Sequence, residues 1–165
     1  MESPNPPTRV LFVCLGNICR SPAAEGVFLH QLGEAQALDQ FVVDSAGTGS
    51  WHVGKPADAR MRAAASRRGI ELPSRARQIE VADLSRFDHI LTMDADNLRG
   101  VHALAANPSA QIESLTRYCR QHRATEVPDP YYGGPEGFEH VLDLLNDACA
   151  GLLKALLEAR PPAHH

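Results

Sequence analysis

Short apolar runs alternate along the chain with longer segments in which apolar residues recur every three or four positions. Four runs have the length and partly β-branched content of buried strands, and they lie at 10–14, 41–45, 89–93 and 112–115. The helical spacing predicts helices at 22–38, 58–68, 81–87, 94–105 and 135–159. This alternation predicts an α/β fold, a small four-stranded parallel sheet with helices on both faces. Ligands of such sheets bind at the carboxyl ends of the strands.

The composition is that of one ordinary globular domain. The chain has 165 residues, of which 44% are hydrophobic and 22% charged, and its formal net charge is −4. A protein that binds nucleic acid or an anionic membrane needs a basic excess, so we expect neither partner. We expect a single domain at 9–159, between a flexible, proline-rich lead at 1–8 and a disordered tail at 160–165.

Three features of the sequence indicate a cytoplasmic protein. The longest unbroken apolar run, from Val10 to Leu15, has six residues and is too short to cross a membrane. The first residues have neither the basic nor the apolar segment of a signal peptide. Four cysteines are too few for a disulfide scaffold, so we expect reduced thiols, and in that setting a cysteine is more often catalytic than structural.

A glycine-rich stretch from Gly49 to Lys55 matches the first seven places of a nucleotide-binding loop. The next place should hold the serine or threonine that binds magnesium, but Pro56 stands there. Proline also lacks the N–H that such a loop donates to phosphate. A flexible surface loop is therefore the better interpretation of this stretch.

A second motif directly follows the first predicted strand and leads into a helix that we expect to open with proline. It consists of Cys14, five residues and then Arg20-Ser21. Loop N–H groups and a helix N-terminus form a positive nest that holds a dianion such as phosphate and stabilises a thiolate. Arg20 can donate two hydrogen bonds to phosphate, and Ser21 can donate one to the sulfur. Gly16 allows close backbone approach, and Asn17 tolerates the left-handed conformation that a nest needs.

Two other interpretations of this motif stay open at the level of spacing. Cys14 could be a small core residue at the end of a strand, with Arg20 in solvent. Cys14 and Cys19 could instead be half of a zinc site, although their spacing is unusual and no second cysteine or histidine pair completes a tetrad. We therefore expect no metal and no cofactor.

The chain closely resembles the low-molecular-weight protein tyrosine phosphatases. The resemblance rests on three long segments, V-C-L-G-N-I-C-R-S-P-A-A-E at 13–25, D-S-A-G-T-G-S-W-H-V-G at 44–54 and V-P-D-P-Y-Y-G-G at 127–134. A shorter segment, L-T-M-D at 91–94, adds to it. It implies a hydrolase that cleaves phosphotyrosine and aryl phosphates without metal. Cys14 would be the nucleophile that forms a cysteinyl phosphate, Arg20 would bind the phosphate, and Asp129 would be the general acid and then the general base.

The resemblance also assigns supporting roles. The phosphate-binding loop would be Leu15, Gly16, Asn17, Ile18, Cys19 and Ser21. Ser45 would hold Asn17 in this loop, and Asp94 would lie near the arginine. Trp51 would form one wall for the substrate ring, and Tyr131 with Tyr132 the opposite wall. Animal members carry a histidine where Arg68 stands, so one hydrogen bond that supports the loop would be missing here.

The resemblance implies phosphotyrosine-containing proteins as substrates, a monomer or weak dimer, and export without a signal peptide as an alternative location. Arsenate reductases of this fold need two further cysteines, and 60–118 contains none. Protein-arginine phosphatases favour threonine in the place of Ile18. A phosphocysteine carrier would need neither Arg20 nor Asp129. We also expect a redox-sensitive site, in which Cys19 traps oxidised Cys14 as a disulfide.

Overall fold

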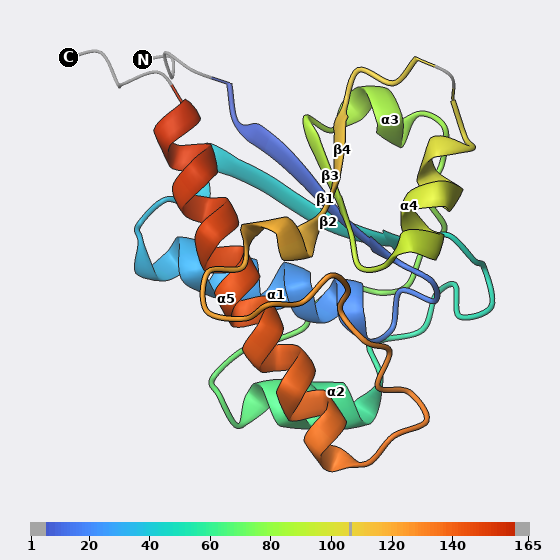
Figure 1. Cartoon of the computed structure of the whole chain (residues 1–165), viewed down its shortest axis with the longest axis vertical. Coiled ribbons are helices and arrows are strands. Elements are labelled where there is room, and N and C mark those ends of the chain that lie inside the picture. Colours follow the sequence, from blue (N-terminus) through green and yellow to red (C-terminus); the bar gives the residue numbers. More distant parts are fainter. Residues whose placement is uncertain (1–5, 106, 161–165) are drawn as a thin grey trace.

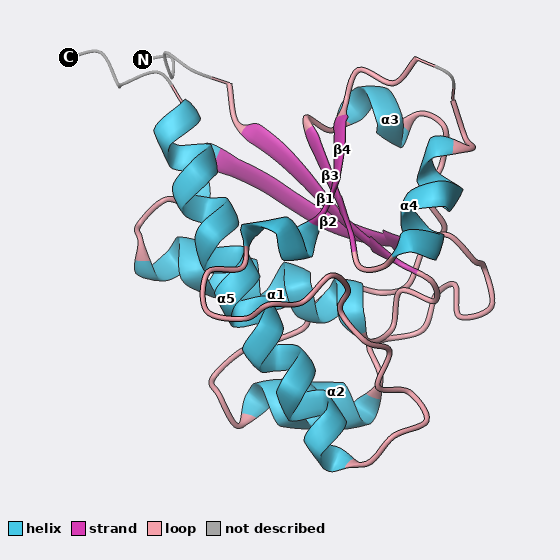
Figure 2. Cartoon of the chain, viewed as in Figure 1, coloured by secondary structure: helices cyan, strands magenta, loops and turns pink. Residues whose placement is uncertain are grey.

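The computed structural model describes residues 6–105 and 107–160, and it contains one four-stranded sheet (Figures 1 and 2). The strands are β1 (Thr8–Cys14), β2 (Phe41–Gly47), β3 (His89–Thr92) and β4 (Gln111–Ser114). Their order is β2-β1-β3-β4, and all three pairings are parallel. The predicted α/β fold is therefore confirmed. Because β1 and β2 are paired in parallel and in register, their carboxyl ends, Cys14 and Gly47, lie opposite each other.

Helices cover both faces of the sheet. They are α1 (Arg20–Glu34), α2 (Ala59–Ser66), α3 (Asp83–Arg86), α4 (Ala95–His102) and α5 (Pro135–Ala159), with short 3₁₀ helices at Leu38–Gln40 and Leu115–Tyr118. In Figure 1, α1 and α5 lie on one side of the strands, and α3 and α4 on the other. The alternation of side chains along β1 follows this division, since Val10 and Phe12 join the core beneath α1 and α5, whereas Leu11 and Val13 join the core on the opposite face.

Several helix boundaries differ from the prediction. Helix α1 begins at Arg20, two residues before the expected proline, and it ends at Glu34 because Gln36 adopts a left-handed conformation with φ of 56°. Asp58 and Asp94 lie just outside α2 and α4, where each carboxylate accepts a backbone N–H of the first turn. These aspartates therefore cap the helices, as short polar side chains commonly do.

The two ends of the described chain lie close together. Arg160, which the prediction assigned to the tail, donates hydrogen bonds to the hydroxyl of Thr8 (2.8 Å) and to the carbonyl of Gln40 (3.2 Å). Strand β1 begins at Thr8, one residue before the predicted start of the domain. Residues 1–5 of the predicted lead at 1–8 and residues 161–165 of the predicted tail at 160–165 lie outside the described residues.

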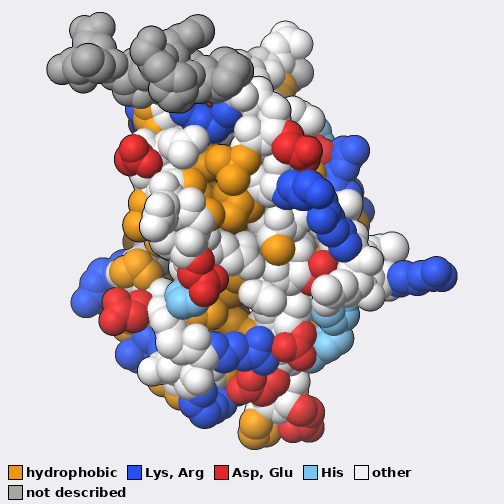
Figure 3. Space-filling model, turned by 90° about the vertical axis from the view of Figure 1, so that its left-hand side faces the viewer, with side chains coloured by type: hydrophobic (Ala, Val, Ile, Leu, Met, Phe, Trp, Pro, Cys, Tyr) orange, Lys and Arg blue, Asp and Glu red, His pale blue; other side chains and the backbone are white. Residues whose placement is uncertain are grey.

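On the face drawn in Figure 3, charged side chains of both signs surround small hydrophobic patches. Among the described residues, no helix combines the length and apolar content needed to cross a membrane.

Candidate active site

The loop between β1 and α1 folds around the sulfur of Cys14. Cys14 is the last residue of β1, and its side chain is almost completely buried. The backbone N–H groups of Asn17 and Ser21 point at Sγ, with N–S distances of 3.3 and 3.4 Å. Asn17 has a φ of 56°, a conformation that turns its N–H toward the sulfur and that few non-glycine residues adopt. The loop is therefore a nest of N–H donors at the N-terminus of α1.

The side chain of Asn17 connects this loop to β2. Its Nδ2 donates to the hydroxyl oxygens of Ser21 (2.7 Å) and Ser45 (3.0 Å). The Ser21 oxygen also lies 3.0 Å from Cys14 Sγ. Because that oxygen already accepts a hydrogen from Asn17, its own single hydrogen can be donated to the sulfur or to the carbonyl of Ala46, which lies 3.4 Å away. The structure thus contains the contact between Asn17 and Ser45 that the family resemblance implies.

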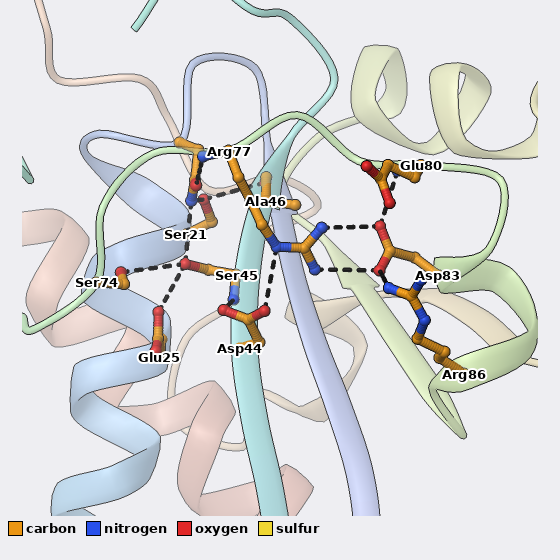
Figure 4. A network of polar contacts seen from close by, with 11 residues as sticks. Ser21, Glu25, Asp44, Ser45, Ala46, Ser74, Arg77, Glu80, Asp83 and Arg86 are labelled. Atoms are coloured by element: carbon orange, nitrogen blue, oxygen red, sulfur yellow. Dashed lines mark hydrogen bonds and ion pairs between the residues drawn. The ribbon is translucent and has the colours of Figure 1, made fainter. Parts of the chain in front are cut away.

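Behind Ser45 lies a buried carboxylate that the sequence analysis did not single out. The Ser45 hydroxyl donates to Glu25 Oε1 at 2.6 Å, and Ser74 Oγ lies 3.4 Å from Ser45 Oγ (Figure 4). Burial raises the pKa of Glu25, and hydrogen bonds from the two serine hydroxyls oppose that shift. Glu25 follows Ser21 by four residues, so the two side chains share one face of α1. This spacing in the sequence could have identified Glu25 as a residue near the loop.

Arg20 is buried at the base of the loop and is held by two carboxylates. Its Nη1 donates to Asp94 Oδ2 (2.7 Å) and to the carbonyl of Val127 (3.1 Å). Its Nη2 lies 3.7 Å from Asp129 Oδ2. Burial alone would lower the pKa of Arg20, but Cys14, Asp94 and Asp129 together raise it, so the guanidinium stays charged.

Asp129 reaches the same site from the loop before α5. Its side chain is 46% exposed, and its Oδ1 accepts the N–H of Tyr131 at 3.0 Å. The loop is fixed two residues earlier, because the N–H of Val127 donates to the carbonyl of Met93 (2.8 Å), next to the end of β3. The carboxylate is thus anchored by its neighbours yet open to solvent and to a ligand.

Cys14, Arg20 and Asp129 line one cavity of about 410 Å³. Its other lining residues are Leu15, Gly16, Ile18, Cys19, Trp51, His52, Tyr131 and Tyr132. Trp51 is 69% exposed, which fits a wall better than a core position. A side chain at Gly49 would approach a ring carbon of Trp51 to 1.8 Å, so only glycine leaves room for the ring as it lies.

The sequence analysis missed two side chains that shape the aromatic wall. The His52 ring lies 6.3 Å from the Tyr131 ring, measured between centroids. The guanidinium of Arg60 lies over the rings of Tyr131 (5.3 Å) and Phe138 (4.8 Å), which is the geometry of a cation–π contact. Neither contact is visible from spacing, because each joins segments far apart in the chain.

Cys19 and Arg68 differ in how they relate to the site. Cys19 borders the cavity, and burial, helped by Asp58, raises the pKa of its thiol to about 12, so it is protonated at neutral pH. Arg68 instead pairs with Glu139 (2.8 Å) and Asp143 (3.0 Å) of α5. Arg68 therefore makes no contact with the loop, and Glu25 and Ser74 lie beside Ser45 instead.

The stretch from Gly49 to Lys55 is a turn that continues from β2, and Pro56 after it bridges to Arg75. The nearest following helix, α2, begins only at Ala59. Within residues 6–105 and 107–160, no three His, Cys, Asp or Glu side chains come together in a way that could hold a metal ion.

The family model described as "Low molecular weight phosphotyrosine protein phosphatase" matches residues 9–161. The chain belongs to this family. A Synechocystis protein, slr0328, that is named for the same family is 49% identical over 152 residues, which cover 90% of this chain and 96% of that protein. Members of the family are hydrolases, and this low-molecular-weight protein-tyrosine-phosphatase is one as well.

Solved structures of relatives have the same fold. A protein tyrosine phosphatase from Entamoeba histolytica, crystallised with Hepes in its active site, is 42% identical with a TM-score of 0.89, covering 92% of this chain and 97% of its own. A Drosophila arginine phosphatase is 32% identical with a TM-score of 0.86, covering 92% of this chain and 99% of its own. Because phosphatases with different named substrates share the fold, the fold alone does not select the phosphorylated residue.

Proposed function

We propose that this phosphatase hydrolyses phosphotyrosine in proteins, and aryl phosphates generally, through a cysteinyl phosphate on Cys14 and without a metal. The observation that carries the proposal is the convergence on one cavity of a nucleophile, a cation and an acid. The Cys14 sulfur lies inside the nest of N–H groups, and the Arg20 guanidinium lies 3.7 Å from the Asp129 carboxylate. Phosphoproteins in the cytoplasm are the substrates we expect.

In the first step, the Cys14 thiolate attacks phosphorus and forms the S–P bond while the bond from phosphorus to the phenolic oxygen breaks. Loop N–H groups and Arg20 stabilise the negative charge on the three remaining phosphate oxygens. Asp129, in its protonated form, gives its proton to the departing phenolate oxygen. The products of this step are a tyrosine side chain and a phosphocysteine.

In the second step, water attacks the phosphocysteine. The Asp129 carboxylate takes a proton from that water, the P–S bond breaks, and inorganic phosphate leaves. The electron pair of the broken bond returns to Cys14 as a thiolate, which the Ser21 hydroxyl at 3.0 Å and the two loop N–H groups stabilise as a leaving group. Asp129 ends protonated, ready for the next cycle.

The walls of the cavity support an aromatic leaving group. Trp51 and Tyr131 line it, and an aromatic ring that stacks on such side chains gains about 0.5–1.5 kcal/mol beyond simple burial. Ile18 keeps an apolar side chain in the same lining. We therefore rank phosphotyrosine above phosphoserine, which has no ring, and above phosphoarginine, whose guanidinium is cationic once released.

The test compares initial rates on phosphotyrosine, phosphoserine and phosphoarginine peptides in the presence of EDTA. We expect phosphotyrosine to be hydrolysed fastest, at a rate that the chelator leaves unchanged. A preference for phosphoarginine, or loss of activity with EDTA, would contradict the proposal.

The role of Asp129 has its own test. Asp129→Asn should slow hydrolysis of phosphotyrosine by about 10²–10⁴-fold, the usual effect of removing a general acid. The loss should shrink for aryl phosphates with acidic phenols, because these leave without a proton. Asp143→Asn, a change at an exposed carboxylate that pairs with Arg68, is the control and should leave all rates unchanged. Equal losses across the leaving groups would place the acid elsewhere.

A further inference from the structure

A second polar cluster lies behind the phosphate-binding loop, outside the cavity, and Arg77 is at its centre (Figure 4). Nη1 and Nη2 of Arg77 donate to the two oxygens of Asp83 at 2.9 and 3.1 Å. Its Nε donates to Asp44 Oδ2 at 3.1 Å. One guanidinium therefore joins β2, which carries Asp44, to α3, which begins with Asp83. Such a bidentate pair fixes the direction of the arginine as well as its distance.

Asp83 makes this contact rigid. Its side chain is completely buried, and it also accepts the N–H of Glu80 at 2.8 Å. The only other cation beside it in the described chain is Arg86, whose Nη1 lies 3.6 Å from Oδ1. A buried carboxylate that loses its cation is strongly destabilised, so Arg77 has little freedom to leave Asp83.

The backbone of Arg77 touches the loop around Cys14. Its N–H donates to Asn17 Oδ1 at 3.0 Å, across 60 positions of sequence. Its carbonyl accepts the N–H of Gly47 at 2.8 Å, and the N–H of Ile79 donates back to the Gly47 carbonyl. The residue whose N–H faces Asn17 is thus fixed to the end of β2 through its carbonyl, and its side chain is fixed to Asp44 and Asp83.

The hydrogen bond from Arg77 determines which way the Asn17 amide faces. If the amide turned over, its NH₂ group would face the N–H of Arg77 and its oxygen would face Ser21 and Ser45. Asn17 would then lose its donors to both hydroxyls. The Ser21 hydroxyl could then satisfy the amide oxygen instead of donating to Cys14 Sγ.

We infer that Arg77, clamped by Asp83, is a positioning residue for Cys14, and that it acts through its backbone N–H on the side chain of Asn17. This inference rests on the proposed function in so far as Cys14 is the nucleophile. Arg77 is not among the residues that line the cavity, so it acts without touching the substrate.

The first test measures alkylation of Cys14 by iodoacetate as a function of pH, with the modified peptide identified by mass spectrometry. In Arg77→Gln, we expect the midpoint of this curve to move to higher pH, because the thiolate loses the Ser21 donor. We expect kcat/KM for an aryl phosphate to fall about tenfold, which is within the usual coupling between contacting residues. A variant that is only less well folded would lose amplitude in both measurements with no shift of the midpoint.

Matched variants separate the clamp from general stability. Arg86→Gln removes the other cation beside Asp83 but touches neither Asn17 nor Gly47, and it should leave the midpoint where it is. Arg77→Lys keeps a positive charge but loses the bidentate pair with Asp83, so it should shift the midpoint of the alkylation curve less than Arg77→Gln does. If Arg77→Gln does not fold, as circular dichroism would show, Asp83→Asn and Arg77→Lys still test the inference.

A double-mutant cycle tests the route through Asn17. If Arg77 acts through Asn17, adding Arg77→Gln to Asn17→Ala should produce little further shift. A full additional shift, or an unchanged midpoint in Arg77→Gln alone, would overturn the inference. Failure of the proposed function would look different, since wild-type protein would then not hydrolyse phosphotyrosine, while the alkylation curves would still report the link between Arg77 and Cys14.

Discussion

Two loops of this protein surround an electron-rich group with backbone N–H donors, and they differ in what occupies the centre. The loop at 14–21 surrounds the sulfur of Cys14 and opens into the cavity. The loop at 120–122 surrounds the Asp147 carboxylate, which accepts the N–H groups of Arg120, Gln121 and His122 at 2.9–3.0 Å. The second nest is filled by a side chain of α5, whereas the first is open to a ligand.

The filled nest stabilises the fold by connecting the loop at 120–122 to α5. Burial would raise the pKa of Asp147, but the three N–H groups and His122 Nδ1, at 3.0 Å, bring it well below its usual range. One turn later on α5, Gly151 packs so closely on Tyr118 that a Cβ would come within 2.0 Å of its carbonyl oxygen. One motif, a nest of N–H groups, therefore stabilises the fold where the chain itself supplies the anion, and where it does not, the nest is left open to a ligand.

The largest expected effect comes from replacing the group at the centre of the open nest. Cys14→Ser should lower turnover by about 10⁴-fold or more, because the serine hydroxyl is not ionised there. The nest itself remains, so inorganic phosphate should still raise the melting temperature, as any ligand of the native state does. Loss of phosphate binding together with activity would mean that the sulfur, not the loop, forms the anion site.

The matching change at the filled nest should affect stability and leave activity intact. Asp147→Asn should lower the free energy of unfolding at pH 7 by about 2–3 kcal/mol, since charged hydrogen bonds to three N–H groups are weakened. Urea denaturation measures this loss, and the rate on an aryl phosphate should stay at the wild-type value. A comparable loss of activity would show that the two loops are not independent.

The same variant has a predicted pH dependence. The pKa of Asp147 is lower in the folded than in the unfolded chain, so its contribution to stability is complete above the ordinary value of 3.8 and is lost as pH falls toward the folded value. The difference in unfolding free energy between wild type and Asp147→Asn should therefore be constant near neutrality and shrink below about pH 4. A difference that grows in acid would contradict the assignment.

Oxidation should also distinguish the two loops. Cys14 faces the open nest, whereas Cys119 lies beside the filled nest. Burial, and to a smaller extent the charge of the nearby Asp147, raises the pKa of Cys119 to about 11, so this side chain stays a thiol. Peroxide should therefore oxidise Cys14, and we expect Cys19 to trap the sulfenic acid as a disulfide. After dithiothreitol, wild type should recover most of its activity and Cys19→Ser several-fold less. Equal recovery would remove this protective role from Cys19.

The smallest effect should come from replacing Trp51 in the aromatic wall of the cavity. Trp51→Ala should raise KM for aryl phosphates about three- to tenfold with little change in kcat, as expected for a stacking contact worth about 0.5–1.5 kcal/mol. Val53→Ala is the matched control, because Val53 is an exposed apolar residue of the same turn that does not line the cavity. A larger fall in kcat than rise in KM would make Trp51 part of the chemistry.

Periodicity and spacing predicted the four strands, the long helices and the position of the Cys14–Arg20 motif at the carboxyl end of the first strand, whereas Asp129 was assigned to that site by the resemblance to the family. These features are local or follow from the fold class, because strands and helices are specified by nearby residues and parallel strands present their ends at one edge. The start of α1 at Arg20 was mistaken because proline is favoured at the first helical position but is also tolerated within the first turn.

By itself, the sequence determined the fold class, the family and the motif that carries the proposed nucleophile. Only the tertiary structure decided how that motif is supported. Glu25 lies behind Ser45, Arg68 points away to α5, and Arg77 reaches Asn17 across 60 positions. A hydrogen bond between distant segments depends on distances of a few tenths of an ångström, and residue spacing carries no information about those distances until the core has brought the segments together.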